Sequence, residues 1–380
     1  MDLQGGGARR YLTELIRGLS QYPEVQVFAF RIVQNDAQQY QHTVALPPKH
    51  TSIADRGYPR TALPVNSIRS VFLATLAVKL KLDIIHFPEQ FPSYLGFHIL
   101  QSLIARRIRV ISTLHDLAPL IVPEAYSIPF AFSSRMLSFT SRFMDSIIAV
   151  SSSTRNDLLA HFKVDPKLVS VVPLGVDTDA FRPSDRNKAA LFVKREFGLA
   201  GPMLLHVGGS HPRKNLVRLV RAFGMAREKG GITHKLVLAG VGASELPELQ
   251  QDVARFGLRN SVFQTPPVDH EALLMLYNAA DGLIYPSLFE GFGLPPLEAM
   301  ACGTPVVASS NSSLPEVIGD AGILVDPYNT SSIAEAILRV TQDRALAQDL
   351  VQRGLERAGL FSWKKTARDT LDVYNHAVAT

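Results

Sequence analysis

Short runs of apolar and β-branched residues alternate along the chain with segments of helical periodicity. Each short run predicts a β-strand, and the longer segments between them, such as residues 67–80 and 94–107, predict helices. Strands and helices that alternate in this way are typical of a parallel sheet covered by helices. In the first half of the chain, strands are predicted at residues 25–30, 83–87, 109–114, 146–150 and 168–173.

The same pattern begins again after the polar, proline-containing stretch 171–185, which we interpret as a connector. The chain therefore predicts two consecutive α/β units, each doubly wound and Rossmann-like, at residues 1–185 and 186–362. Ligands of such sheets bind at the carboxyl ends of the strands, so two facing sheets would form a cleft. In the second unit, strands are predicted at residues 202–209, 235–240, 261–266, 282–287, 305–309 and 323–325.

The last segment, residues 363–380, predicts a helix with Ser362 as its N-cap. Its apolar side chains form one stripe at Trp363, Ala367, Leu371 and Tyr374. Almost no strand separates this helix from the second unit. It is therefore either a final surface helix or a helix that crosses back to complete the first unit.

The beginning of the chain departs from the doubly wound pattern. Such a unit normally starts with a buried strand that leads into a glycine loop, yet Gly5–Gly7 follow only Met1–Gln4. We expect the first strand to be missing or cut short. The three glycines either surround an anion with their backbone N–H groups or form a flexible start.

Composition narrows the class of protein. A chain of 380 residues, with 46% apolar and 19% charged residues, can bury two cores of ordinary size and is not disordered. Its single cysteine, Cys302, excludes an internal disulfide and a cysteine-rich zinc site, and it favours a reducing compartment. The sequence contains no apolar run of the roughly 18 residues that cross a bilayer, and no signal-peptide core near Met1. We expect a cytoplasmic protein.

Positive charge is concentrated in the first half of the chain, which carries all of the net charge of +5. This excess favours either anionic lipid head groups at the inner face of a membrane or an acidic substrate, unless it is simply a solvated surface. The segments 67–81 and 133–144 are amphipathic, so they either contact a membrane or face the sheet as buried helices. We expect no nucleic-acid partner, because the basic residues are scattered.

The most informative stretch is SLFEGFGLPPLEAMACGTPVV, residues 287–307, which predicts a strand end, a glycine loop, a helix and a further strand. Glycine at 291 and 293 allows the backbone to approach a ligand closely. The loop leads into a helix N-terminus, which favours anions. Glu290 precedes the loop and Glu298 is expected in the first helical turn, so both carboxylates can face one cleft.

Carboxylates accept hydrogen bonds, so hydroxyl-rich ligands such as ribose and a hexose are their natural partners. The alternative is that Glu298 only caps its helix and that Glu290 lies in solvent. A cationic pair, Arg213 and Lys214, follows a predicted strand in GSHPRKN. Such a pair can stabilise the charge of a departing diphosphate, unless it is a solvated helix start.

Other segments are weaker candidates. His115 and Asp116 follow the strand 109–114, where Asp116 either takes part in chemistry or only caps the next segment of the chain. Asp177-Thr178-Asp179 has the spacing of a metal-binding motif but lies in the connector, so we expect no metal. Residues 240–242 lack the third glycine of a dinucleotide fingerprint.

Taken in order, these segments resemble the family-four retaining glycosyltransferases, or group 1 glycosyltransferases, of GT-B architecture and bacterial polysaccharide type. The resemblance covers nearly the whole chain, and it includes the two glutamates with seven residues between them. The matching segments are residues 5–19, 112–120, 148–158, 171–181, 208–223, 287–309 and 361–374.

The resemblance implies a role for each matched residue. Glu298 would hold the ribose and Glu290 the transferred sugar, while Arg213 and Lys214 grip the pyrophosphate. His115 would lie beside the donor sugar and orient the reaction. The remaining donor-binding residues that it implies are Gly6, Gly7 and Gly209 near the phosphates, Val268 and Leu273 near the base, and the amides of Gly291, Phe292, Gly293 and Leu294.

The implied reaction is a retaining, metal-independent transfer of a hexose from a sugar nucleotide, UDP-glucose or GDP-mannose in type, to a glycan or lipid-linked saccharide. The sugar nucleotide is a co-substrate, and no other cofactor is expected. Three alternatives remain at this point: a sugar-nucleotide epimerase, a nicotinamide dehydrogenase, and a non-catalytic nucleotide-binding subunit of a polysaccharide assembly.

Overall fold

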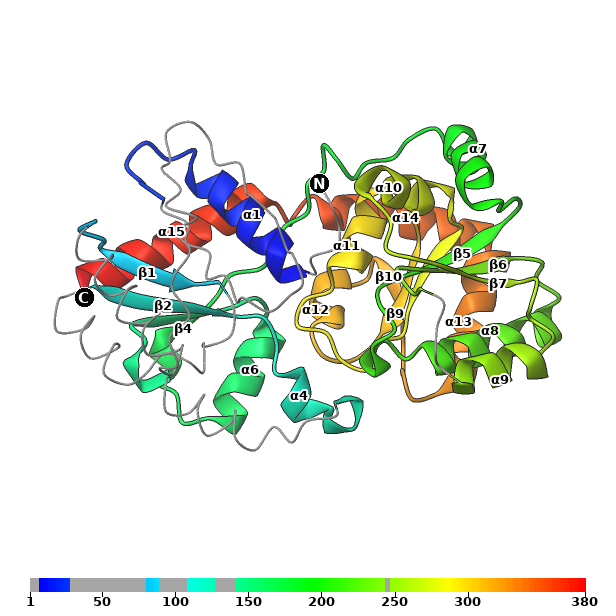
Figure 1. The fold of residues 1–380 in the computed structure, drawn as a ribbon, viewed down its shortest axis with the longest axis horizontal. Coiled ribbons are helices and arrows are strands. Elements are labelled where there is room, and N and C mark those ends of the chain that lie inside the picture. Colours follow the sequence, from blue (N-terminus) through cyan, green and yellow to red (C-terminus); the bar gives the residue numbers. More distant parts are fainter. Residues whose placement is uncertain (1–6, 28–79, 89–107, 127–140, 243–246) are drawn as a thin grey trace, which may run out of the picture.

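Two α/β units lie side by side, each built around a parallel sheet, which confirms the predicted fold class (Figure 1). The computed structural model describes residues 7–27, 80–88, 108–126, 141–242 and 247–380. Gly6 lies outside these residues, as do the predicted helix 94–107 and most of the predicted helix 67–80. Of the predicted strand 25–30, residues 25–27 are not in a strand and the rest are not described.

In the described part of the first unit, four parallel strands follow one another in chain order. These are β1 (Ile84–Phe87), β2 (Arg109–Leu114), β3 (Ser146–Ala149) and β4 (Val169–Val171). The strands β2 and β3 are almost fully buried, as expected for a parallel sheet covered on both faces. Its described helices are α1 (Gly7–Leu19), α4 (Ala118–Ile121) and α6 (Ser152–His161), with short 3-10 turns η1 (Pro123–Ala125), η2 (Ser141–Phe143) and η3 (Pro166–Leu168).

The second unit is doubly wound, with strand order β7-β6-β5-β8-β9-β10. Its winding direction reverses between β5 and β8, and this is the switch point where doubly wound sheets bind ligands. The strands are β5 (Met203–Val207), β6 (Lys235–Ala239), β7 (Val262–Thr265), β8 (Gly282–Tyr285), β9 (Val306–Ser309) and β10 (Gly322–Val325).

Helices cover both faces of this second sheet because neighbouring strand residues point to opposite sides. Leu204 packs in a core with α8 and α13, whereas Leu205 packs in the other core with α10, α11 and α12. The helices of the unit are α7 (Arg186–Phe197), α8 (Leu216–Gly230), α9 (Pro247–Arg255), α10 (His270–Ala279), α11 (Leu294–Ala301), α12 (Leu314–Ile318), α13 (Thr330–Gln342) and α14 (Arg344–Ala358), and the turn η4 (Pro212–Lys214) precedes α8.

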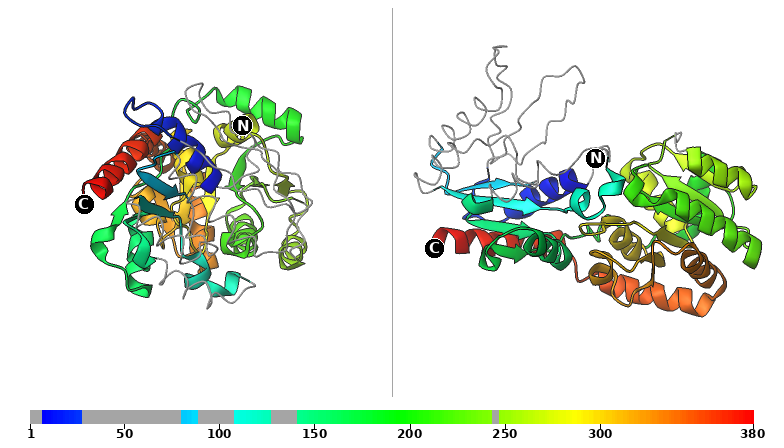
Figure 2. Two further views of the ribbon diagram at one scale, coloured as in Figure 1. Left: turned by 60° about the vertical axis from the view of Figure 1, so that its left-hand side comes forward. Right: turned by 90° about the horizontal axis from the view of Figure 1, so that it is seen from below.

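The C-terminal helix α15 (Trp363–Ala379) crosses back to the first unit, where it lies beside α1 (Figures 1 and 2). Ser362 caps it, as predicted, by accepting from the N–H of Lys365. The two helices touch closely because Gly18 faces Ala367, and a Cβ atom at Gly18 would lie 2.5 Å from that of Ala367. On its other side Val373 packs with the strand residues Ile111 and Ile148 and with Val172, which follows β4.

The two chain segments that join the units run together. Val176 pairs with Ser362 in a parallel bridge, and its N–H donates to the carbonyl of Phe361 at 3.1 Å. No side chain fits at Gly175, because a Cβ atom there would lie 2.2 Å from the backbone nitrogen of Trp363. The boundary between residues 185 and 186 stays a prediction.

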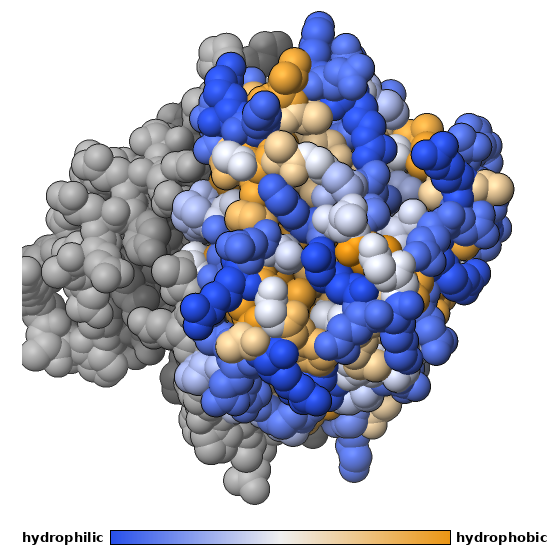
Figure 3. All heavy atoms as spheres, turned by 90° about the vertical axis from the view of Figure 1, so that its right-hand side faces the viewer, coloured by the Kyte–Doolittle hydropathy of each residue, from blue (hydrophilic) through white to orange (hydrophobic). Residues whose placement is uncertain are grey.

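The helices of the described residues can be compared with a membrane span in length and hydropathy. None of them has the length and apolar character needed to cross a bilayer. Figure 3 shows the end face of the second unit, where hydrophilic side chains cover most of the surface and apolar ones gather in small separate areas. The amphipathic segments 67–81 and 133–144 lie mostly outside the described residues, so their membrane contact stays a prediction.

Candidate active site

Three predicted site residues meet at the switch point of the second sheet. Arg213 and Lys214 lie in η4, directly after β5, and Glu290 lies in the loop after β8. Asn215 holds the two segments together, since its side-chain amide donates to the carbonyls of Pro286 and Pro327 at 2.9 and 2.8 Å. The pair Arg213-Lys214 therefore belongs to a fixed 3-10 turn and not to a solvated helix start.

Glu290 is the centre of this cluster and is only 6% exposed. Its Oε1 accepts from Lys214 Nζ at 2.6 Å and from the Tyr285 hydroxyl at 3.0 Å, and its Oε2 accepts from Arg213 Nη1 at 2.8 Å. Burial alone would raise the pKa of Glu290, but Lys214 and Arg213 outweigh it and lower that pKa to about 2. The carboxylate is therefore ionised at physiological pH.

The two cations differ in their surroundings. Burial lowers the pKa of Lys214, while Glu290 partly restores it. Arg213 keeps 22% of its side-chain surface exposed and also donates to the carbonyl of Phe289 at 3.1 Å. In the described structure both cations bond to Glu290. A diphosphate would therefore share or replace these contacts.

Two serines contact the backbone of the loop that carries Glu290. Ser312 Oγ accepts from the Glu290 N–H at 3.1 Å, and Ser313 Oγ lies within hydrogen-bond distance of the carbonyls of Glu290 and Phe292. Gly293, with a φ of 108°, turns the chain into α11. Because Pro295 and Pro296 have no N–H, the amide donors at this helix start are those of the loop itself, from 291 to 294.

The position of Glu298 corrects one sequence prediction. It is the fifth residue of α11 and lies beyond the first turn, because the helix begins at Leu294. Its carboxylate is 3% exposed and does not cap the helix. Instead Oε1 accepts from Arg10 of α1, and Oε2 accepts from the Tyr277 hydroxyl at 2.9 Å. Burial raises the pKa of Glu298, while Arg10 and Tyr277 oppose that rise.

The first unit meets the glycine loop of residues 290–293 at His115. The backbone of Gly291 is so close that a Cβ atom there would lie 1.8 Å from the His115 carbonyl oxygen. The His115 ring has Nε2 at 2.8 Å from the carbonyl of Pro88, and it packs edge-on against Tyr11 with ring centroids 5.0 Å apart. The structure thus brings His115 beside the glycine loop, and its place beside the donor sugar stays a prediction.

The other residues that the sequence predicts for the site differ in their contacts and in their burial. Asp116 accepts from the N–H of Ala118, the first residue of α4, at 3.0 Å. Gly7 starts α1 near Leu294, whose Cδ1 would lie 3.6 Å from a Cβ atom at Gly7. Gly209 is exposed, Val268 is half-buried in the loop before α10, and Leu273 is buried in the core of the second unit. In the connector, Asp177 caps its own turn by accepting from the N–H groups of 179 and 180.

Sequence reasoning missed three residues that bond the two glutamates, namely Tyr285, Tyr277 and Arg10. Tyr285 is the last residue of β8, and its ring stacks on His206 with centroids 5.4 Å apart. Burial lowers the pKa of His206 to about 4, so this stack is neutral at pH 7. The position of this tyrosine, at the end of the strand that leads into the loop of Glu290, indicates a side chain near the site. For Tyr277 and Arg10 no local pattern indicates the contact.

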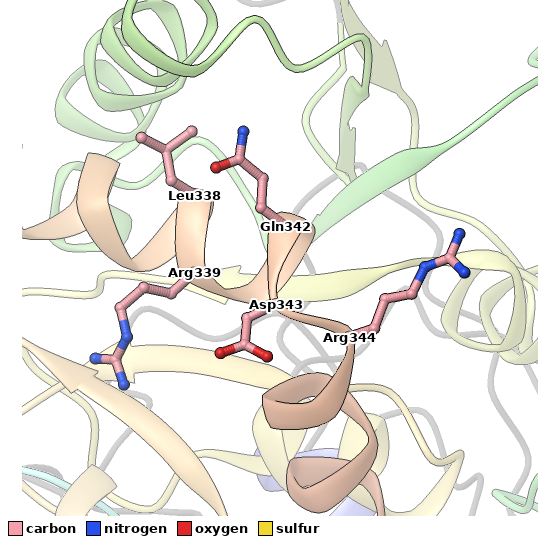
Figure 4. A pocket seen from close by; sticks show the side chains of 5 residues that line it. All are labelled: Leu338, Arg339, Gln342, Asp343 and Arg344. Carbon is pink, nitrogen blue, oxygen red and sulfur yellow. The ribbon is translucent and has the colours of Figure 1, made fainter.

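A hollow of about 450 Å³ lies elsewhere, at the junction of α13 and α14 (Figure 4). It is lined by Leu338, Arg339, Gln342, Asp343 and Arg344. Its polar groups serve the fold, because Gln342 donates to the carbonyl of Gly230 and Asp343 caps α14. The two arginines extend in different directions in Figure 4. The hollow therefore does not form a site of converging groups.

Two Rossmann-like units, each built on a parallel sheet, give the chain the GT-B architecture. Residues 187–357 match the family described as glycosyl transferases group 1, and residues 5–180 match glycosyltransferase family 4. The chain belongs to the group 1 glycosyltransferases.

Two similar proteins are named as glycosyltransferases, in agreement with this family. O-antigen chain mannosyltransferase B of Escherichia coli is 32% identical over 269 residues, which are 70% of this chain and 70% of that protein. D-inositol 3-phosphate glycosyltransferase of Actinosynnema mirum is 36% identical over 244 residues, which are 61% of this chain and 58% of that protein. The chain thus spans little more than half the length of the second relative.

Solved structures show the same fold at lower identity. Sucrose-phosphate synthase of Thermosynechococcus elongatus has a TM-score of 0.75 at 24% identity, over 99% of this chain and 94% of that chain. HepE of Anabaena, solved with UDP-glucose, has a TM-score of 0.75 at 19% identity, over 98% and 97% of the two chains.

Proposed function

We propose that this glycosyltransferase is a retaining hexosyltransferase of polysaccharide synthesis. It moves a hexose from a sugar nucleotide to a hydroxyl of a glycan or lipid-linked saccharide. The observation that carries the proposal is the contact of Glu290 with Lys214, Arg213 and Tyr285 at the switch point of the second sheet. This cluster combines an ionised acceptor of hydroxyl hydrogen bonds with two cations suited to a diphosphate.

The charges suit a departing nucleoside diphosphate. Negative charge builds on the phosphate as the sugar leaves, and Arg213 and Lys214 stabilise that charge more in the transition state than in the ground state. These two cations supply the positive charge that a divalent metal supplies in other transferases, so we propose a metal-independent reaction. Glu290 binds the hydroxyls of the transferred sugar and Glu298 those of the ribose.

Retention follows from attack on the face that the nucleotide leaves. The bond between the anomeric carbon and the phosphate oxygen breaks, the acceptor oxygen forms the new bond, and the acceptor proton passes to the departing phosphate. His115 lies beside the donor loop and orients the sugar. Asp116 is engaged with the Ala118 N–H, and the mechanism assigns it no nucleophilic role.

The donor is proposed from the relatives. The HepE structure contains UDP-glucose, and the O-antigen relative is a mannosyltransferase, so UDP-glucose and GDP-mannose are the two donor types that we propose. A thermal-shift screen with UDP, GDP, ADP and their sugars separates them, because specific binding raises the melting temperature. Transfer of labelled sugar to a saccharide acceptor then separates a transferase from an epimerase, which would interconvert the free sugar nucleotide.

Two variants test the roles in the site. Glu298→Ala should weaken nucleotide affinity, measured by titration calorimetry. Lys214→Ala should chiefly lower turnover, by about 100-fold if it matches other losses of a charge-stabilising donor. If both variants kept the wild-type affinity and rate, the roles assigned to Glu298 and Lys214 would be wrong. Specific nucleotide binding without transfer to any of a broad panel of acceptors would favour a non-catalytic subunit.

We also propose that the basic first unit contacts the membrane that carries a lipid-linked acceptor. The excess of positive charge in the first half of the chain supports this contact. Flotation with anionic and with neutral liposomes tests it, and we expect co-migration with the anionic liposomes alone. Absence of co-migration with either would remove the membrane contact and leave the transfer reaction unaffected.

A further inference from the structure

The segment Ser312–Glu316 contacts both halves of the site. At its beginning, Ser312 and Ser313 hold the loop that carries Glu290 through their hydrogen bonds with the loop backbone. At its end, Glu316 lies in the short helix α12 and reaches across to the first unit. Five consecutive residues thus connect the loop to the opposite unit.

Glu316 binds the beginning of helix α6 with both carboxylate oxygens. Oε2 accepts from the N–H of Ser152 and Oε1 from the N–H of Ser153, each at 3.0 Å. The next N–H, that of Thr154, is taken by the side chain of Ser151 at 3.0 Å. The first turn of α6 is therefore capped jointly by its own Ser151 and by a carboxylate from the other unit. A carboxylate is stabilised at a helix N-terminus by the free N–H groups and by the helix dipole.

The same turn of α6 contacts the residues of the site. Thr154 Oγ1 lies 3.3 Å from the carbonyl of His115 and 3.3 Å from the carbonyl of Gly291. The Thr154 hydroxyl is buried between the two units, next to the close approach of Gly291 to His115. Any movement of α6 relative to α12 would therefore move His115 relative to the loop of Glu290.

We infer that Glu316 is a positioning residue that docks the first unit on the second and thereby sets His115 against the loop of Glu290. Glu316 touches none of the groups assigned to donor binding, so its loss should open the interface and leave the nucleotide site intact. The docking stands on the contacts alone. Its effect on turnover rests on the proposed function.

The first test needs no substrate. In Glu316→Gln, one amide of the α6 turn loses its acceptor, and hydrogen exchange of peptides that contain Ser152 and Ser153 should become about tenfold faster or more, because hydrogen bonds to charged groups are the stronger ones. The radius of gyration from X-ray scattering should also increase. The control is Glu335→Gln on α13, an exposed glutamate of the second unit, which should match the wild type. Unchanged exchange in Glu316→Gln would overturn the docking.

The second test uses the proposed reaction. Glu316→Gln and Thr154→Val should each lower kcat by about tenfold or more while nucleotide affinity stays within about twofold, because small misplacements of reacting groups are costly. Thr154→Ser keeps the hydroxyl and should recover most of the rate. A loss of nucleotide affinity equal to the loss of kcat would overturn the positioning role. If the wild type transfers no sugar, the proposed function fails, while the exchange and scattering results still decide the docking.

Discussion

The guanidinium of Arg10 in the first unit bonds the carboxylate of Glu298 in the second, although the two residues lie 288 positions apart in the chain. Arg10 also lies over the ring of Phe181, 4.8 Å from its centroid. Glu298 is buried, so Arg10 and Tyr277 are the groups that offset the cost of its charge. A ligand hydroxyl that bound Glu298 would therefore meet a carboxylate that already has two partners.

This pair predicts a stability change that depends on pH. Arg10→Ala should destabilise the protein by about 1–3 kcal/mol at pH 8, because it leaves a buried carboxylate without its cation. The pKa of Glu298 is already raised by burial and should rise further. A raised pKa means that ionisation costs stability above that pKa, and that the cost disappears as pH falls through it. Urea unfolding at pH 8 and pH 5 measures the difference.

The matched control is the double variant Arg10→Ala with Glu298→Gln, which removes both charges. It should be more stable at pH 8 than Arg10→Ala alone. An Arg10→Ala variant that is equally destabilised at both pH values would contradict the explanation.

Glu290 should show the opposite dependence on pH. Its folded pKa is lowered from 4.5 to about 2, so its ionised form stabilises the fold above pH 4.5, and this contribution is lost as pH falls from 4.5 to 2. Glu290→Gln should cost about 3–5 kcal/mol at pH 7, because it leaves Lys214 and Arg213 without their partner. The stability curves of wild type and variant should converge below pH 4.5. Curves that stay parallel down to pH 2 would rule out this assignment.

Gly291→Ala should separate the interface from the nucleotide site. The added methyl would lie 1.8 Å from the His115 oxygen and 2.8 Å from Asp116 Cβ, so the two units cannot meet as they do in the wild type. We expect kcat to fall by about 100-fold, with nucleotide affinity changed much less. Gly242→Ala is the control, since a Cβ atom there meets nothing within 4 Å. A Gly291→Ala variant with the wild-type rate would show that this contact is not needed for turnover.

A buried polar chain should hold the C-terminal helix to the first sheet. His86 bonds the Tyr374 hydroxyl through Nδ1 at 2.6 Å and Thr113 through Nε2 at 2.8 Å. Burial lowers the pKa of His86 to about 3, so the ring is neutral and needs both partners. Tyr374→Phe should cost about 1–3 kcal/mol in urea unfolding, because it leaves a buried nitrogen unpaired.

Tyr328→Phe provides the comparison for Tyr374→Phe. Tyr328 is 54% exposed, and surface substitutions of this kind usually change stability by less than about 0.5 kcal/mol. Equal effects of the two substitutions would mean that the polar chain contributes nothing to stability.

The amino-acid sequence by itself determined most of the described strands, and it predicted the candidate residues of the site, whose roles stay predictions. Apolar runs predicted the strands β5 to β10 within a few residues, because parallel strands are buried on both faces and need continuous apolar sequence. Because the ends of β5 and β8 were predicted, the turn after β5 and the loop after β8 could be placed at the carboxyl ends of these strands. Glu290, Arg213 and Lys214 were therefore predictable at one edge of the sheet, and the strand order of the structure, with β8 beside β5, makes them neighbours.

Only the tertiary structure decided how the two units complete one another. The contacts of Arg10 with Glu298, of Glu316 with α6, and of α15 with α1 join residues far apart in the chain. The hydrophobic periodicity of a segment does not indicate such contacts. They depend on the shape and charge of two surfaces that exist only after each sheet has folded. The sequence therefore specified the chemistry of each unit, and the packing between the units selected which of these charged groups face one another.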